Sequence, residues 1–128
     1  MCEFSGRGDE VWARASDLEA VPIYWHGTRE FVVARSEVRI SADIKFAFGG
    51  RGKAEVVVNE ENRTVTINYL RGPFKGRQTI AVGNHAVEAV WDVSFNGAFK
   101  LLGRWNESHF RAGTKNALRR LCSGSASV

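Results

Sequence analysis

Apolar and polar residues alternate through the middle of the chain. The clearest run covers residues 38–48, where the apolar positions are Val38, Ile40, Ala42, Ile44, Phe46 and Phe48. A period of two predicts a strand with one face toward the core and the other toward water. The same pattern returns over residues 54–58, 65–69, 74–82 and 87–95. The sequence therefore predicts a succession of strands.

Turn-forming residues separate these strands. The clusters are Gly49–Gly52, Asn59–Asn62, Arg71–Pro73 and Gly83–Asn84. Connections this short favour antiparallel hairpins. Thr28–Glu37 contains good β-forming residues and predicts one further strand, and Cys2–Ser5 predicts a short opening strand.

The pattern changes to a helical period near the end of the chain, from Gly97 to about Cys122. Apolar positions recur at steps of three to five, at Phe99, Leu102, Trp105, Phe110, Gly113, Ala117 and Leu121. Basic residues occupy a separate face, at Lys100, Arg104, Arg111, Lys115 and Arg119. Such an amphipathic helix must bury its apolar side. After a series of strands, the available partner is the sheet.

Two short helices are predicted near the beginning of the chain. Val11, Trp12 and Ala15 follow Asp9, and Leu18 and Val21 follow Asp17. We expect Asp9 and Asp17 to be N-caps, because a carboxylate can accept hydrogen bonds from the free amides of a first helical turn.

Composition agrees with one domain covering residues 1–128. Of these residues 44% are hydrophobic and 25% are charged, which is typical of a globular protein. The sequence has neither a long apolar span nor a basic and apolar leader after Met1, so a cytoplasmic location is expected. Cys2 and Cys122 stand near opposite ends. Free thiols are favoured over a terminal disulfide.

The motifs along the chain resemble those of the START-like proteins, also called the SRPBCC or helix-grip superfamily. The matching segments are Glu10–Trp12, Asp17–Gly27, Gly72–Gly76, Val90–Val93 and Gly113–Leu121. The resemblance covers nearly the whole chain. It is nearest to the polyketide cyclase/dehydrase-like branch and to the branch related to a carbon monoxide dehydrogenase subunit. Ser5–Gly8 stands where the family has a longer first strand.

The resemblance implies an α+β helix-grip fold. In this fold a curved antiparallel sheet of about six or seven strands wraps a long C-terminal helix, with two short helices near the N-terminus. It also implies a cavity between sheet and helix for a small hydrophobic ligand, such as a lipid, a quinone or a polyketide-like aromatic molecule. The ligand-binding candidates are Phe46, Tyr69, Gln78, Trp91, Leu102, Trp105 and His109.

The residues themselves leave two interpretations of these aromatic side chains open. Four Trp and eight Phe in 128 residues can form pocket walls, or they can simply fill the core. Gln78 is in phase with the apolar face of its strand and could orient a ligand, whereas Glu88 and Asp92 are out of phase with Trp91. His109 could donate to a ligand or could lie at the edge of the helix.

The sequence favours binding over catalysis. An enzyme of the cyclase/dehydratase type needs an acid or base inside the cavity, and none is in phase with the apolar faces. His26, His85 and His109 are widely separated and have no metal-ligand spacing, so no metal and no cofactor are expected.

The charge distribution suggests a further alternative. The segment from Gly97 to Cys122 contains six basic residues and one acidic residue, Glu107. This basic face could dock on an anionic membrane surface or an acidic partner, or it could simply be hydrated. Nucleic acid is not expected as a partner, because no aromatic platform accompanies the charges. Both a monomer and a homodimer remain open.

Overall fold

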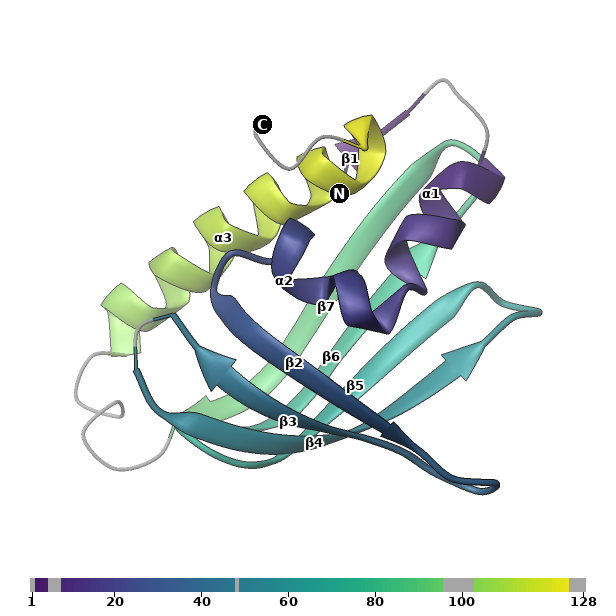
Figure 1. The fold of residues 1–128 in the computed structure, drawn as a ribbon. Helices are drawn as coiled ribbons and strands as arrows, with labels where there is room; N and C mark the ends of the chain where they lie inside the picture. Colours follow the sequence, from purple (N-terminus) through teal and green to yellow (C-terminus); the bar gives the residue numbers. More distant parts are fainter. Residues whose placement is uncertain (1, 5–7, 48, 96–102, 125–128) are drawn as a thin grey trace.

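A long C-terminal helix lies across an antiparallel sheet in the computed structural model, which describes residues 2–4, 8–47, 49–95 and 103–124 (Figure 1). The strands are β1 (Cys2–Glu3), β2 (Thr28–Arg35), β3 (Ile40–Phe46), β4 (Arg51–Asn59), β5 (Thr64–Arg71), β6 (Phe74–Val82) and β7 (Ala86–Phe95). The helices are α1 (Gly8–Ala15), the 3₁₀ turn η1 (Leu18–Ala20), α2 (Val21–Tyr24) and α3 (Gly103–Ser123).

The sheet is a meander in which β2 to β7 follow one another. Its order is β1-β7-β6-β5-β4-β3-β2, and every neighbouring pair is antiparallel. The predicted hairpins are therefore confirmed. The short β1 joins the opposite edge of the sheet, where Cys2 pairs with Val87.

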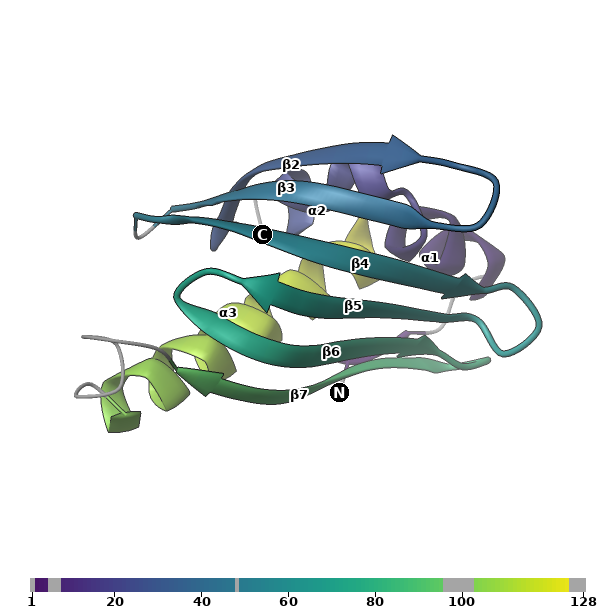
Figure 2. The same cartoon turned by 90° about the horizontal axis from the view of Figure 1, so that it is seen from below.

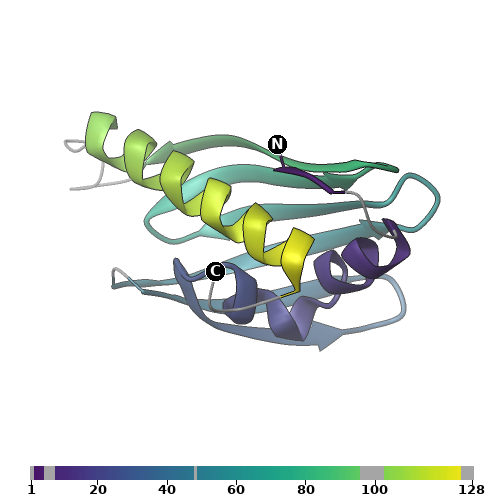
Figure 3. The same ribbon diagram turned by 90° about the horizontal axis from the view of Figure 1, so that it is seen from above.

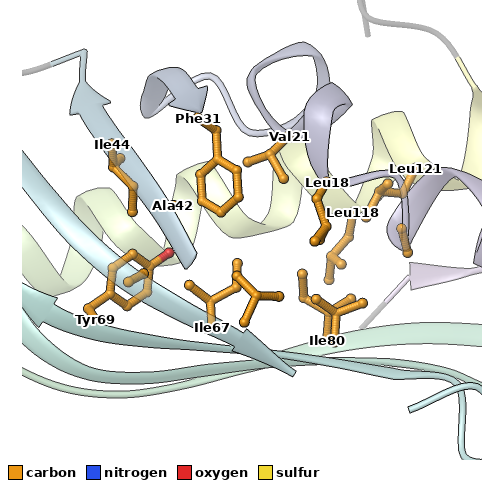
Figure 4. Close-up of a cluster of buried hydrophobic side chains, with 14 of the residues drawn as sticks. Leu18, Val21, Phe31, Ala42, Ile44, Ile67, Tyr69, Ile80, Leu118 and Leu121 are labelled. Atoms are coloured by element: carbon orange, nitrogen blue, oxygen red, sulfur yellow. The ribbon is translucent and has the colours of Figure 1, made fainter. Parts of the chain in front are cut away.

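The period-two alternation determines which side chains reach the core. In β5, for example, Val65, Ile67 and Tyr69 are buried while Thr64, Thr66 and Asn68 are only partly covered. Figure 4 shows Ile67, Tyr69 and Ile80 of the sheet below Leu18 and Val21 of the N-terminal helices. Burying apolar surface of this kind contributes about 25 cal/mol per Å².

Two strand ends, the start of β3 and the start of β4, lie elsewhere than predicted. Val38 is 90% exposed and lies in the β2–β3 turn, where the Ser36 amide donates to the Arg39 carbonyl. The predicted Gly49–Gly52 turn is also shorter, because Gly52 pairs with Ile44 inside the sheet. Phe48 lies outside the described residues.

Gly76 allows two strands to approach closely at the β6–β7 pair. Its φ is +136°, and a Cβ placed there would lie 2.1 Å from the Asp92 carbonyl oxygen. Side-chain-bearing residues rarely adopt this backbone conformation. The geometry of β6 at this point therefore depends on glycine.

All described helices cover the same face of the sheet. Seen from above, α3 runs diagonally across the sheet (Figure 3); it contacts β7 and β1, while α1 contacts β6 and α2 contacts β2. Seen from below, the helices lie behind the sheet (Figure 2). Ala117, Leu118 and Leu121 of α3 are buried, which confirms that this part of the helix packs on the sheet. The predicted start of the helix, residues 97–102, lies outside the described part of the chain.

The N-terminal acids do not cap helices as predicted. Asp9 lies inside α1 and pairs with Arg63 in the β4–β5 turn. Asp17 occupies the N-cap position of η1, but its side chain makes no capping hydrogen bond. Because α1 begins at Gly8, Asp9 lies past the N-cap position. The neighbouring Trp12 indole also donates to Glu60 of the β4–β5 turn, at 2.8 Å.

Arg14 ties α1 to the last turn of α3. Its guanidinium donates to the Leu121 carbonyl at 2.7 Å and to the Cys122 carbonyl at 3.1 Å. These carbonyls have no partner within the helix, so a cation is favourable there. None of the helices in the described ranges is long and apolar enough to span a membrane.

Candidate ligand-binding site

A cavity of about 390 Å³ lies between α3, the sheet and the segment that follows α2. Its apolar wall consists largely of aromatic rings. The lining residues are Trp25, His26, Gly27, Thr28, Phe46, Ala47, Tyr69, Phe74, Trp91, Phe110, Gly113, Thr114, Asn116 and Arg120. His26, Ala47 and Asn116 are exposed and mark the mouth of the cavity.

The aromatic rings pack against one another as a continuous cluster. Trp91 stacks on Tyr69 with ring centroids 5.8 Å apart and an interplanar angle of 15°. Phe110 of α3 lies 4.8 Å from Trp91, and Trp25 meets the same indole edge-on at 6.2 Å. Such pairs contribute beyond simple area burial. The wall of the cavity is therefore a set of mutually packed rings.

Two hydrogen bonds fix the orientation of the rings at the centre of the cluster. The Trp91 indole donates to the Thr114 hydroxyl at 2.7 Å, which joins β7 to α3. The Tyr69 hydroxyl donates to the Gln78 side-chain carbonyl at 3.1 Å. Burial raises the pKa of the Tyr69 hydroxyl, so this group stays a protonated donor.

Gln78 is the one buried polar side chain of the described residues, at 2% exposure. Its amide nitrogen has no hydrogen-bond partner. The bond from Tyr69 holds the side-chain carbonyl, and Trp91 faces Gln78 across the β6–β7 pair. Gln78 does not line the cavity and lies behind Tyr69. It can therefore position the Tyr69 ring.

Replacing Tyr69 with phenylalanine should destabilise the protein by about 1–3 kcal/mol, because it leaves the Gln78 carbonyl buried without a donor. The double change Tyr69→Phe with Gln78→Leu should restore much of this loss, since both polar partners are then gone. Urea unfolding of the variants measures the effect. Strictly additive losses would contradict a coupled pair.

Polar groups gather at the mouth of the cavity. The Arg120 guanidinium donates to the Tyr24 carbonyl at 3.0 Å, which connects α3 to the end of α2. A ring nitrogen of His26 lies 2.9 Å from the Ile23 carbonyl oxygen. The cavity thus combines an aromatic interior with a cation and an imidazole at its entrance.

The structure brings together three of the predicted site residues. Phe46, Tyr69 and Trp91 line the cavity, and Gln78 supports it from behind. Leu102 and the side chains of Trp105 and His109 lie outside the described residues.

Several lining residues were not among the predicted site residues. Phe74 and Phe110 were in phase with the apolar faces of their elements, so the sequence pattern could have found them. The phase of the apolar pattern did not point to Trp25, His26 and Arg120. They reach the cavity because α2 ends beside α3, which is a tertiary contact without a local period.

The chemistry available to the site is limited among the described residues. The titratable side chains of the lining are Tyr69, His26 and Arg120. Glu88 and Asp92 are exposed, as their phase predicted. The residues that the structure describes hold no group of three or more His, Cys, Asp and Glu that could bind a metal ion.

Comparison with solved structures identifies the fold. The protein TTHA0849 from Thermus thermophilus superposes with a TM-score of 0.76 at 17% identity, covering 95% of this chain and 91% of that protein. A START superfamily protein from Mycobacterium smegmatis superposes with a TM-score of 0.66 at 15% identity, covering 94% of both chains. The fold is START-like.

A third structure of the same fold is an enzyme. This chain superposes on the Zhui aromatase/cyclase from Streptomyces sp. R1128 with a TM-score of 0.60 at 13% identity, covering 97% of this chain and 94% of that one. No family model matches the sequence, and no curated protein is similar to it. Identities this low establish the fold alone. The predicted helix-grip architecture is confirmed.

Proposed function

We propose that this START-like domain binds a small hydrophobic ligand with an aromatic ring system in the cavity between sheet and α3. The observation that carries the proposal is the cavity of about 390 Å³ walled by aromatic side chains. Ligand pockets are typically ~300–1,000 Å³, apolar inside and furnished with a few polar groups.

The size of the cavity favours a compact ligand. Because 390 Å³ is near the lower end of the usual range, a few joined rings suit it better than a long acyl chain. Of a lipid, a quinone and a polyketide-like aromatic molecule, the last two are therefore the better candidates. The nearly parallel Trp91 and Tyr69 rings line the cavity, and such a ligand would pack against them.

Binding would work by enclosure. Apolar ligand surface leaves water, which contributes about 25 cal/mol per Å², while Arg120 and His26 accommodate a polar end at the mouth. Binding also places the ligand beside Trp25 and Trp91, so their fluorescence should report occupancy.

The first test is native mass spectrometry of the purified protein, followed by titration with 1,4-naphthoquinone and with palmitate as probes. We expect a retained small molecule or saturable quenching by naphthoquinone at one site, and weaker binding of palmitate. Tight palmitate binding would reverse the preference for rings. Failure of both probes, with no retained molecule, would contradict the proposed function.

An enzyme of the cyclase/dehydratase type is the second candidate. His26 favours it, because an imidazole at the cavity mouth can act as a general acid or base, and one structure of similar fold is an aromatase/cyclase. The two functions differ in the fate of the ligand. A probe recovered with unchanged mass supports binding, whereas a changed mass that depends on His26 supports catalysis.

Docking through the basic face of α3 is a third candidate. Arg111, Lys115 and Arg119 are exposed on this helix, whereas Arg120 turns toward the cavity. An exposed row of cations attracts anionic lipid surfaces. A protein that binds neither probe but sediments with phosphatidylserine vesicles at low salt would support this function.

A further inference from the structure

The structure places the two cysteines, which are far apart in the sequence, next to each other. The short β1 lies beside the last turns of α3 (Figures 1 and 3). The Cys122 thiol donates to the Cys2 carbonyl oxygen at 3.8 Å. Both side chains are partly exposed and both are free thiols.

The two thiols also interact with each other. Burial raises the pKa of the Cys122 thiol, and the neighbouring Cys2 thiol raises this pKa further through a hydrogen bond and through its charge. The backbone segments are held in place independently, since Cys2 pairs with Val87 and Arg14 binds the Cys122 carbonyl.

A hollow of about 380 Å³ gives access to Cys2. It is lined by Cys2, Glu3, Lys115 and Arg119. The two cations in this lining, Lys115 and Arg119, attract anionic reagents. Cys2 is therefore reachable by a small anionic molecule, and the Cys122 thiol, 3.8 Å from the Cys2 carbonyl oxygen, is the second thiol.

We propose that Cys2 and Cys122 are a disulfide-forming pair that is oxidised by an anionic low-molecular-weight disulfide such as oxidised glutathione. The Cys2 thiolate attacks one sulfur of the reagent and releases one glutathione thiolate. The Cys122 sulfur, after losing its proton to solvent, attacks the mixed disulfide at the Cys2 sulfur and releases the second. Two protein thiols are thereby oxidised to one disulfide, and one oxidised glutathione is reduced to two thiols.

Cys2 is the attacking residue in this sequence. Cys2 lines the hollow that admits the reagent, whereas the raised pKa of Cys122 leaves little of that thiol as thiolate at neutral pH. Once Cys2 has entered the mixed disulfide, it no longer offers a thiol or a negative charge to Cys122, so two causes of the raised pKa disappear. The second step then becomes easier.

The disulfide would link β1 to the end of α3 and close a loop of nearly the whole chain. A cross-link removes more conformational entropy from the unfolded chain when the loop that it closes is longer. For a domain of this size we expect the melting temperature to rise by about 10 °C.

The experiment treats the full chain with oxidised glutathione and follows it by intact mass, non-reducing peptide mapping and thermal unfolding. We expect the loss of two hydrogens, a Cys2–Cys122 peptide and a higher melting temperature that a reductant reverses. Cys122→Ser should stop at a stable glutathione adduct on Cys2. Stable adducts on both cysteines of the unaltered chain, or disulfide-linked dimers alone, would overturn the proposal.

A matched pair of reagents tests the role of the hollow. The variant Lys115→Gln with Arg119→Gln should react severalfold more slowly with oxidised glutathione, which is anionic. Its reaction with hydroxyethyl disulfide, which is neutral, should change less. Equal slowing with both reagents would show that the cations do not attract the oxidant.

Discussion

Replacing Gly113 with leucine should weaken binding of an aromatic probe at least tenfold while making the protein more stable. Gly113 lines the cavity, and a Cβ placed on it meets no atom within 4 Å. The leucine side chain would therefore enter free space that the ligand needs. Replacing a glycine in a helix interior with a good helix former also stabilises the helix by about 1 kcal/mol.

Titration with 1,4-naphthoquinone and urea unfolding of the same samples measure both effects. Gly113→Ala is the matched control, because it has a similar helical gain but adds only one methyl group to the cavity. A leucine variant that binds as well as the alanine variant would place the ligand elsewhere. This design separates a blocked pocket from a damaged fold, since the expected stability change is favourable.

Replacing Gly76 with alanine should cause the largest loss of stability, more than about 3 kcal/mol. The new Cβ would lie 2.1 Å from the Asp92 carbonyl oxygen and 2.7 Å from the Val93 Cα. Both are backbone atoms of β7, so the contact can be relieved only by moving strands apart. The φ of +136° adds strain.

Gly83→Ala is the control for this variant, because Gly83 belongs to the turn between the same two strands. A Cβ at Gly83 would lie 3.4 Å from the nearest atom, the Ala86 carbonyl oxygen, and we expect a change below about 1 kcal/mol. Thermal and urea unfolding give the comparison. Equal stability of the two variants would show that β6 and β7 separate easily at Gly76.

Local patterns predicted most of the fold because the sheet is a simple meander. The alternation of Val65, Ile67 and Tyr69 indicated both the strand and its buried face. Strand ends were less predictable. Val38 continues the alternation of β3 in sequence, yet it lies in the turn, because the hairpin closes between Ser36 and Arg39.

Only part of the candidate site followed from the sequence. Strand phase brought Phe46, Tyr69 and Trp91 to one concave face, which any alternation analysis can detect. The mouth depends on α2 ending beside α3, and no local pattern encodes that approach. Asp9 shows the same limit, since its ion-pair partner Arg63 lies in a turn distant in sequence.

The position of β1 has a consequence for how this protein folds. Its hydrogen bonds reach β7, and Arg14 of α1 binds carbonyls at the end of α3, so the first elements depend on the last. Such sequence-distant contacts raise the contact order and slow folding. During synthesis, β2 to β6 can pair as they leave the ribosome. The β1 edge is completed once β7 has emerged, and the cover of the sheet only when residues 103–123 have followed.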